Sequence, residues 1–304
     1  MIAADLFSGL GGWTEGATGA GVRVLWAANH WPAAVAAHRA NHPDVHHECQ
    51  DLMQVDWRAL PDLRDGMLIA SPACQGFSPN GRPGRTVRGA AVKHQADRNT
   101  AWAVLAAADT ARPAIILAEN VPDFAEWELF PSWCATLRAM GYMVAHQVVN
   151  ALDHGVPQDR RRLIVQARRD REPRLIAPTA RGRGFGEVLD TGDDWQDIDD
   201  KNPGIAARMR AAQGRAGRQC LWANVDRARG RRLDEPAPTM TTRSAGQWYV
   251  LSGDRCRVLT VRELARIQTF PDSYQLPAGR TLAGKLLGNA IPVRMARAIV
   301  EQVA

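Results

Sequence analysis

Paired cysteines at C-x-x-C spacing are absent from this sequence, whose five cysteines are spread unevenly over 304 residues. Neither a disulfide framework nor a bound metal is therefore expected, and a reducing cytoplasm is the expected compartment. Four of the cysteines, namely Cys49, Cys134, Cys220 and Cys256, are interpreted as small buried hydrophobic residues.

Long apolar runs are also absent, because no segment approaches the roughly 18 residues of a membrane span. The first apolar stretch contains Asp5 and has no basic segment before it, so neither a signal peptide nor a membrane partner is expected. Hydrophobic residues make up 45% and charged residues 23% of the chain, which is ordinary for a globular protein. The length is sufficient for one large core and a smaller lobe.

Lysine is scarce, with three Lys among 38 basic residues, which leaves 35 Arg. Residues 160–232 contain 18 Lys and Arg against ten Asp and Glu, whereas the rest of the chain contains 20 against 22. A basic segment on a nearly neutral body is typical of contacts with phosphates. A solvated surface in an arginine-rich proteome is an equally good interpretation of the composition alone.

Short apolar runs alternate with helical patterns over residues 2–170, which predicts a doubly wound α/β domain. Strands are expected at residues 2–7, 22–28, 66–70, 114–118, 144–150 and 163–167, the last two antiparallel, with a short strand before Asp51. Helices are expected at residues 13–20, 32–41, 100–110, 127–140, 258–269 and 282–300. Between about 168 and 232 the sequence has no long helical or strand periodicity, which indicates disorder or a small irregular domain.

Residues 5–12, D-L-F-S-G-L-G-G, connect the first strand to the first helix through a glycine turn. Such a turn lets a nucleotide-type cofactor approach the backbone at a helix N-terminus. Because the glycines at positions 9, 11, 12 and 16 fit G-x-G-x-x-G poorly, a nicotinamide-dependent oxidoreductase is set aside.

Cys74 follows the strand at 66–70 in the string S-P-A-C-Q-G-F-S. The loop at residues 76–99 contains five basic residues and one acid, a setting that can lower a thiol pKa and so favour a nucleophilic thiolate. A buried structural cysteine is the alternative.

Glu119 ends an apolar strand, where a carboxylate is costly unless it is functional or paired. Protonated or sharing a proton, it can hydrogen-bond N3 of a cytosine and accept from N4, or it can form a salt bridge with an arginine, or do both. Arg160 and Arg162 alternate along an extended segment, so both are expected to face one side, toward a base carbonyl or a phosphate. Together with Cys74, these residues indicate covalent chemistry on a cytosine base.

The order of these motifs resembles that of the cytosine-C5 DNA methyltransferases over residues 2–170 and 257–297. The resemblance rests on D-L-F-S-G-L-G-G, P-A-C-Q-G-F-S, E-N-V, Q-D-R-R-R, the block at 257–272 and G-N-A-I-P-V at 288–293. It implies a doubly wound mixed α/β sheet of the methyltransferase type with a small irregular target-recognition domain. Residues 1–170, completed by 257–304, would form the catalytic domain, and 171–256 the target-recognition domain.

The resemblance implies S-adenosyl-L-methionine (AdoMet) as the methyl donor and double-stranded DNA as the substrate. Catalytic roles would fall to Cys74, Glu119, Arg160 and Arg162, with Cys74 adding to C6 of a flipped cytosine. The donor would be bound by Phe7, Ser8, Gly9, Leu10, Gly11, Gly12, His30, Trp31, Asp51, Leu52, Asn289 and Ala290. DNA or base contacts would come from Gln75, Ser78, Asn120 and Gln158. A monomer in a bacterial or phage-infected cell is expected, with a restriction endonuclease as a further candidate partner.

Two positions depart from the family pattern. The residue before the nucleophile is Ala73 in place of proline, which leaves a roomier site. His30 stands where the family has a glutamate that holds the ribose, and a neutral imidazole accepts only one hydrogen bond. The roomier site keeps a carboxylated AdoMet donor as an alternative. An RNA substrate, which one branch of the family uses, and an inactive DNA-binding module are kept as further alternatives.

Overall fold

A computed structural model gives the fold of the chain and describes residues 1–73, 88–192, 194–225 and 229–304, with the backbone alone over 88–96. The chain forms two compact units. Unit 1 consists of Met1–Asn150, Arg161–Ala177 and Ala296–Ala304, and unit 2 of Ala151–Arg160 and Pro178–Met295. The domains expected from the sequence have other boundaries, because they place residues 151–160 and 257–295 with the first 150 and residues 171–177 in the second domain.

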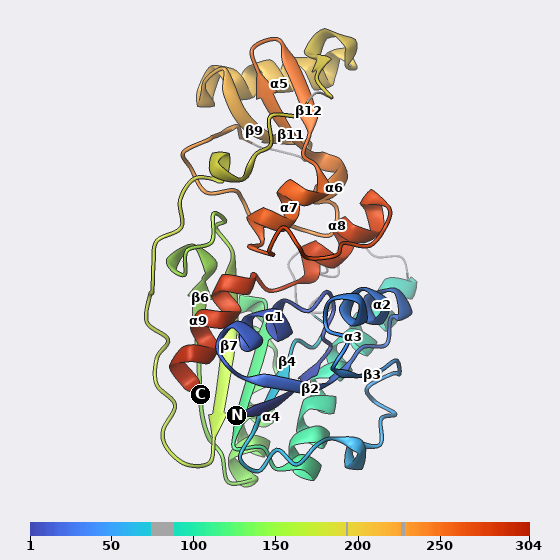
Figure 1. Ribbon diagram of the computed structural model, residues 1–304, viewed down its shortest axis with the longest axis vertical. Coiled ribbons are helices and arrows are strands. Elements are labelled where there is room, and N and C mark those ends of the chain that lie inside the picture. The colour runs from blue at the N-terminus through green and yellow to red at the C-terminus, as the bar shows by residue number, and fades with distance from the viewer. Residues whose placement is uncertain (74–87, 193, 226–228) are drawn as a thin grey trace. The chain divides into compact units, whose positions relative to one another are not determined.

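Unit 1 is built on a mixed sheet of seven strands (Figure 1). These are β1 (Ile2–Leu6), β2 (Arg23–Ala28), β3 (His46–Glu48), β4 (Met67–Ala70), β5 (Ile115–Asn120), β6 (Met143–Asn150) and β7 (Arg161–Arg168). Their order is β3-β2-β1-β4-β5-β7-β6, with β1 to β5 parallel and β7 antiparallel to both β5 and β6. The predicted doubly wound mixed sheet and the antiparallel pairing of the last two strands are confirmed.

The helices of unit 1 connect these strands. They are α1 (Gly12–Gly19), α2 (Pro32–Asn41), α3 (Arg88–Ala111) and α4 (Phe130–Ala139), with short turns η1 (Trp57–Ala59) and η3 (Pro122–Glu126). Pro32 begins α2 because its fixed φ suits the first helical position, and the predicted bounds of this helix are confirmed. Helix α3 is longer than the predicted segment at 100–110, since it begins at Arg88.

The central strands of the sheet of unit 1 are buried on both faces. Every residue of β4 and β5 is buried, as expected for parallel strands that are covered on both sides. Ala4 and Leu6 share one core with residues from α3 and α4, so these two helices cover that face. Asp5 lies between them along β1, and its side chain therefore points to the opposite face.

Unit 2 contains an antiparallel sheet of five short strands. They are β8 (Gln196–Asp197), β9 (Gln219–Ala223), β10 (Arg231–Arg232), β11 (Trp248–Ser252) and β12 (Arg255–Val258), in the order β10-β9-β11-β12-β8. Helix α5 (Pro203–Ala216) packs its buried residues Ala206, Met209 and Ala212 into the same core as Trp222 and Leu251. Residues 168–232 therefore contain more regular structure than the sequence indicates.

The remaining elements of unit 2 are mostly helical. They are η4 (Ala151–Asp153), η5 (Phe185–Val188), η6 (Ile198–Asp200), α6 (Ser244–Gln247), α7 (Val261–Ile267) and α8 (Arg280–Asn289), followed by α9 (Val293–Val303), which ends in unit 1. The single helix predicted at 282–300 is wrong, because α8 and α9 are separate helices. Ala290 is extended at their junction, and Pro292 cannot donate the hydrogen bond that a continuous helix requires.

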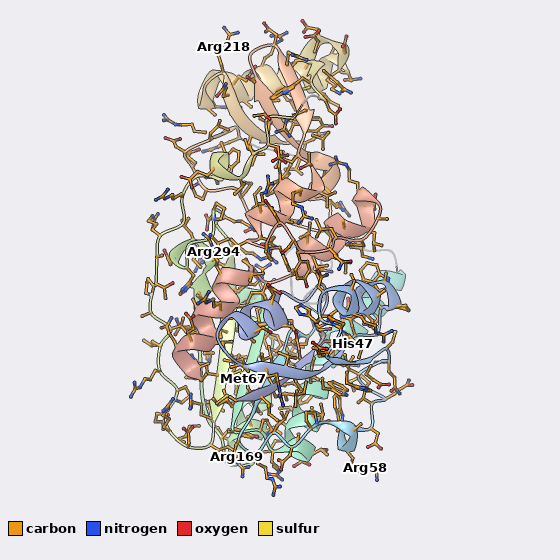
Figure 2. The ribbon with its side chains drawn as sticks, in the orientation of Figure 1. His47, Arg58, Met67, Arg169, Arg218 and Arg294 are labelled. Carbon is orange, nitrogen blue, oxygen red and sulfur yellow. The ribbon has the colours of Figure 1, made fainter. Side chains whose placement is uncertain are left out.

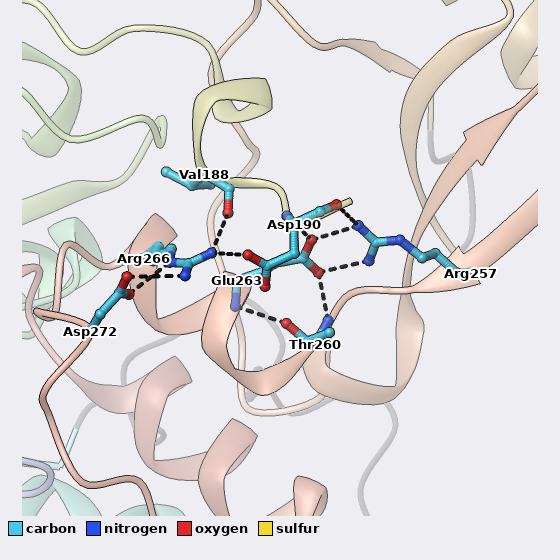
Figure 3. Close-up of polar contacts among 7 residues, drawn as sticks. All are labelled: Val188, Asp190, Arg257, Thr260, Glu263, Arg266 and Asp272. Carbon is cyan, nitrogen blue, oxygen red and sulfur yellow. Dashed lines mark hydrogen bonds and ion pairs between the residues drawn. The ribbon is translucent and has the colours of Figure 1, made fainter. Parts of the chain in front are cut away.

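A buried ion pair joins β12 to α7 within unit 2 (Figure 3). The Arg257 guanidinium donates to both carboxylate oxygens of Glu263 at 2.8 and 2.6 Å, and both side chains are almost fully buried. Glu263 also accepts from the backbone N–H of Thr260, whose hydroxyl accepts from the N–H of Glu263. This capping box makes α7 begin at Val261, three residues later than predicted.

Candidate active site

The residues predicted for the donor in unit 1, and the segment that leads to Cys74, follow the carboxyl ends of adjacent parallel strands. The donor turn follows β1, His30 and Trp31 follow β2, and Ala73 and Cys74 follow β4. The chain leaves β1 toward β2 on one side, whereas β4 lies on the other side of β1. Such a reversal of strand order opens a crevice at the carboxyl ends, where α/β proteins bind their ligands.

The turn after β1 fits a nucleotide-type donor. Phe7, Gly9 and Gly11 have positive φ angles of 61°, 55° and 95°, so the backbone folds back tightly before α1. The Ser8 N–H donates to the Ala28 carbonyl at 3.0 Å, and the Gly11 N–H to the Ser8 carbonyl at 2.9 Å. Gly11 caps α1 without a side-chain acceptor, and the N–H groups of a helix N-terminus attract negatively charged groups.

The other residues predicted for the donor in unit 1 lie after β2 and β3. Asn29 is buried, and its side-chain carbonyl accepts from the Trp31 N–H at 3.0 Å, which shapes the turn that presents the exposed His30. Asp51 is exposed and accepts from the Met53 N–H at 3.0 Å, whereas Leu52 is buried. The roles of these residues in holding a donor stay predictions.

Residues from α3 and β5 hold the segment that leads to Cys74. The Ala73 N–H donates to the Thr100 hydroxyl at 3.0 Å, and the Asn120 amide donates to the Pro72 carbonyl at 3.1 Å. Asn120 therefore fixes the backbone before the predicted nucleophile. Cys74, Gln75 and Ser78 themselves lie outside the described residues.

Glu119 and Arg162 form an ion pair between β5 and β7. The Arg162 Nε lies 2.8 Å from the Glu119 Oε1, and the two side chains are 11% and 8% exposed. This confirms the predicted salt bridge of Glu119 to one of the arginines. Because the pair is nearly buried, the Glu119 carboxylate is held in one orientation at the end of β5.

Arg160 and Gln158 belong to unit 2, and their side chains are buried there. The Arg160 guanidinium donates to the backbone carbonyls of Met240, Gly288 and Ala290 at 2.8 to 3.0 Å. Gln158 is fully buried, donating to the Gln268 side chain and accepting from the Met240 N–H. These contacts favour structural roles over the predicted contacts of Arg160 and Gln158 with a base.

Asn289 and Ala290, predicted to close the donor pocket, lie at the end of α8 in unit 2. Asn289 is exposed, whereas the Ala290 carbonyl accepts from Arg160 and Gln268. A Cβ at Gly288 would lie 2.4 Å from the backbone carbon of Thr241, so these two segments pack in direct contact.

The cysteines outside the predicted site have ordinary roles, with one correction. Cys134, Cys220 and Cys256 are buried as predicted, whereas Cys49 is exposed. Burial raises the pKa of the Cys220 thiol to about 11, and also raises the pKa of Cys134 and of Cys256. These three buried thiols are therefore poor nucleophiles.

Several arginines of unit 2 are neutralised by acids of the same unit. Arg210 contacts Asp199 at 2.6 Å and Asp254 at 3.1 Å, and Arg232 contacts Asp234 at 2.8 Å. The exposed Arg218 lies immediately before β9 (Figure 2).

In the parts of the chain that the structure describes, no helix is both long and apolar enough to cross a membrane.

Comparisons with known proteins identify the family. The family model for C-5 cytosine-specific DNA methylases matches residues 1–183 and 180–304, so the chain belongs to this family. The chain is therefore a DNA cytosine-C5 methyltransferase, and AdoMet is the methyl donor of the family.

Individual relatives match over nearly the whole chain. Type II methylase M.HgiDII from Herpetosiphon aurantiacus is 28% identical, with 98% of this chain and 94% of the relative covered. Type II methyltransferase M1.HphI from Haemophilus parahaemolyticus is also 28% identical, with 98% and 85% covered. A putative DNA modification methyltransferase from an E. coli prophage shares the fold, with a TM-score of 0.70, 20% identity, and 99% and 98% covered. The S. pombe Dnmt2 methyltransferase shares it with a TM-score of 0.71, 18% identity, and 99% and 97% covered.

Three contacts at the candidate site were not predicted from the sequence. These are the Thr100 hydroxyl at Ala73, a hydrogen bond of 3.0 Å from the Trp13 indole to the Ser71 hydroxyl, and one of 2.8 Å from the Thr14 hydroxyl to Asp5. A carboxylate inside an apolar first strand was the one available signal, since Asp5 requires a polar partner there.

Proposed function

We propose that methyl transfer by this protein proceeds through a covalent adduct between Cys74 and C6 of a cytosine that has left the DNA stack. The observation that carries this proposal is the buried ion pair of Glu119 and Arg162 at 2.8 Å. It lies at the end of β5, the strand that pairs with β4 so that Ala118 is opposite Ala70. Cys74 comes four residues after Ala70 in the chain.

Each group has a distinct role in the proposed reaction. The Cys74 thiolate adds to C6, which makes C5 electron-rich, and Glu119 favours that addition by sharing a proton with N3 and accepting from the amino group at N4. Arg162 orients Glu119 and offers its remaining N–H groups to the base carbonyl O2. When bound, AdoMet would supply an electrophilic methyl group to C5, with S-adenosylhomocysteine as the leaving group. Loss of the C5 proton and departure of the Cys74 thiolate then restore the ring.

The donor is proposed to bind at the turn formed by residues 7–12. The backbone there is tightly folded by positive φ angles and ends at the N-terminus of α1, so a ligand can contact main-chain groups. Leu10 is fully buried and would contribute its backbone alone. Trp31, Asp51 and Leu52 are proposed to hold the adenosine part from the ends of β2 and β3.

Residues 171–256 are proposed to recognise duplex DNA. This segment holds most of β8 to β12 and α5, and it contains most of the basic segment at residues 160–232. Binding through several phosphate contacts would weaken steeply with salt, because each contact releases counterions. Affinity for duplex DNA that stayed flat between low and physiological salt would contradict this role.

The cellular setting is also a proposal. The named relatives M.HgiDII and M1.HphI are Type II enzymes, which supports a modification enzyme that works beside a restriction endonuclease. We propose that it acts as a monomer in the cytoplasm of a bacterial or phage-infected cell.

The proposed function is tested by incubating the protein with labelled AdoMet and genomic duplex DNA, followed by digestion to nucleosides and mass spectrometry. We expect label in 5-methylcytosine, and its loss in Cys74→Ser and Glu119→Gln. Label in RNA alone, supplied in a parallel reaction, would contradict a DNA substrate. No transfer to either nucleic acid would indicate an inactive binding module.

A second arm addresses Ala73 and His30 by supplying carboxylated AdoMet together with AdoMet in equal amounts. Ala73 leaves more room beside the nucleophile than proline would, and His30 is exposed at the end of β2. We expect 5-methylcytosine as the only modified base. A heavier base that carries the carboxylated group would instead establish the substituted donor.

A further inference from the structure

A chain of hydrogen bonds runs through the interior of unit 1 beside the donor turn. The Thr14 hydroxyl contacts the Asp5 carboxylate at 2.8 Å, and the His38 Nε2 contacts the same hydroxyl at 3.0 Å. The other ring nitrogen of His38, Nδ1, lies 2.8 Å from Nε2 of His47. Asp5, Thr14 and His38 are fully buried, whereas His47 on β3 is partly exposed (Figure 2).

The direction of these bonds follows from the donors and acceptors available. If Asp5 is ionised it accepts from the Thr14 hydroxyl, which can then accept from His38 Nε2–H. His38 Nδ1 is in that case unprotonated and accepts from His47 Nε2–H. The four side chains, which come from β1, α1, α2 and β3, thus form one continuous series of hydrogen bonds. In it the histidines and the threonine are neutral, and the Asp5 carboxylate is the charged acceptor at the end.

The same series can also run in the opposite direction. A proton that enters at His47 can shift along the chain until Asp5 is neutral, because each member then donates where it had accepted. Burial raises the pKa of Asp5 to about 7, against opposing hydrogen bonds from Thr14, and burial lowers the pKa of His38 well below its usual value. Burial also lowers the pKa of His47. Both His38 and His47 are therefore largely neutral near pH 7.

Other ionisable groups surround the chain. They come from α1, α2 and β3 and are Glu15, Arg39, His42, His46 and Glu48. Burial lowers the pKa of His42 to about 4, and its Nε2 lies 3.8 Å from Glu15. Since His42 is also largely neutral at pH 7, it places no positive charge beside His38 there.

The first turn of α1 is thereby held from two sides. Thr14 is bonded to Asp5 and His38, and its neighbour Trp13 donates to the Ser71 hydroxyl at 3.0 Å. Ser71 follows β4 and lies three residues before Cys74. The helix starts directly after the glycine turn, with a glycine and no side-chain acceptor at its cap. The orientation of its first N–H groups therefore depends on Trp13 and Thr14.

We propose that Thr14 and His38 are positioning residues for the methyl donor, which hold the glycine turn and the first turn of α1 in the geometry that binds it. The proposal rests on the donor occupying the turn at residues 7–12. Neither residue touches the donor in this scheme. Both act through the backbone of α1, which pre-organises the N–H groups that meet the ligand.

The test compares Thr14→Val, which keeps the shape and removes the hydroxyl, with Thr14→Ser, which keeps the hydroxyl. The matched control is Thr18→Val on the exposed face of the same helix. We expect Thr14→Val to raise the Kd of AdoMet, measured by calorimetry, about tenfold. This change corresponds to the net free energy of about one hydrogen bond, which the variant no longer has to hold the site in its binding geometry. The kcat at saturating donor should change far less than the Kd, and Thr14→Ser should restore most of the affinity.

A measurement on the donor-free protein distinguishes a positioning role of Thr14 from direct contact with the donor. In the donor-free protein, amide hydrogen exchange over residues 7–14 should be faster in Thr14→Val than in Thr18→Val, because the first turn of α1 is no longer held. If Thr14→Val fails to fold, His47→Gln at the partly exposed end of the chain replaces it, with a smaller rise in Kd expected.

Wild-type affinity and wild-type exchange in Thr14→Val, or in His47→Gln where that variant replaces it, would overturn the proposal. Its failure is distinguishable from failure of the proposed function. If the wild-type protein binds AdoMet and methylates DNA while the variants do so equally well, only the positioning role is wrong. If the wild-type protein neither binds AdoMet nor modifies DNA, the proposed donor site itself is wrong.

Discussion

Replacing Asp5 with asparagine should change how the free energy of unfolding depends on pH. Asp5 is fully buried in β1, and burial raises its pKa from 3.8 to about 7. At about 1.4 kcal/mol per pKa unit, the ionised carboxylate costs the folded protein about 4 kcal/mol above that pKa. An asparagine of nearly the same shape does not carry this cost.

The sign follows from the two pKa values. Between pH 3.8 and about 7 the folded protein retains a proton on Asp5 that the unfolded chain has lost. The contribution of Asp5 to stability therefore falls as pH rises through this window, with a limiting slope of about 1.4 kcal/mol per pH unit. Asp5→Asn should be increasingly stable relative to wild type as pH rises. Because the new amide N–H groups need acceptors, a constant penalty of about 1–3 kcal/mol is expected to offset part of the gain.

The assay is urea unfolding of wild type and Asp5→Asn without donor, between about pH 4 and about pH 8, with the difference in unfolding free energy plotted against pH. Titrating groups outside the chain of Asp5, Thr14, His38 and His47 largely cancel in this difference. The exposed Asp44 provides the control, since Asp44→Asn removes a carboxylate that is already in contact with water. A difference for Asp5→Asn that does not change with pH would refute the assignment of a raised pKa to Asp5.

Two further predictions concern the packing of unit 2. Arg257→Ala leaves the buried Glu263 carboxylate without its bidentate partner, so thermal and urea unfolding should show a loss of about 3–5 kcal/mol, whereas leucine at both positions should cost much less. Gly288→Ala places a Cβ 2.4 Å from the Thr241 backbone and should destabilise the protein by at least about 1–3 kcal/mol. Gly214→Ala, in α5 with no atom within 4 Å of its new Cβ, should instead stabilise it by about 0.5–1 kcal/mol. Equal effects of the two glycine substitutions would contradict this account of the packing.

Much of unit 1 could be predicted from the sequence because its signals are local. Proline at the start of an alanine-rich stretch defines α2 at Pro32–Asn41, and apolar runs between turns define the buried parallel strands. The antiparallel pair β6 and β7 was also predicted. Each of these elements is specified by residues that lie within about ten positions of one another.

The missed elements have weak local patterns. Helix α5 buries only Ala206, Met209 and Ala212, and two of these are too small to produce a clear apolar stripe. Strands β8 and β10 have two residues each, and are ordered by pairing with β12 and β9. The break between α8 and α9 had a local signal in Pro292, which the apolar periodicity on either side obscured.

The residues of the candidate site also fall into two groups, those with a local signal in the sequence and those without one. Glu119 was predicted because a carboxylate at the end of an apolar strand is unusual, and its pairing with Arg162 was one of the two outcomes considered. The buried roles of Gln158 and Arg160 could not be predicted, since their partners lie 80 or more positions away in the sequence. His38 likewise depends on residues of three other elements, which only the fold brings together.

The central claim is that Cys74 forms a covalent bond with the target cytosine, and trapping on DNA that contains 5-fluorocytosine tests it most directly. Fluorine at C5 cannot leave as the proton does, so after methyl transfer the adduct should persist through a denaturing gel. We predict an adduct that requires AdoMet, that maps to the peptide containing Cys74 on digestion, and that is absent from Cys74→Ser. An adduct formed equally well by Cys74→Ser, or no adduct from a wild-type protein that methylates ordinary DNA, would contradict the account.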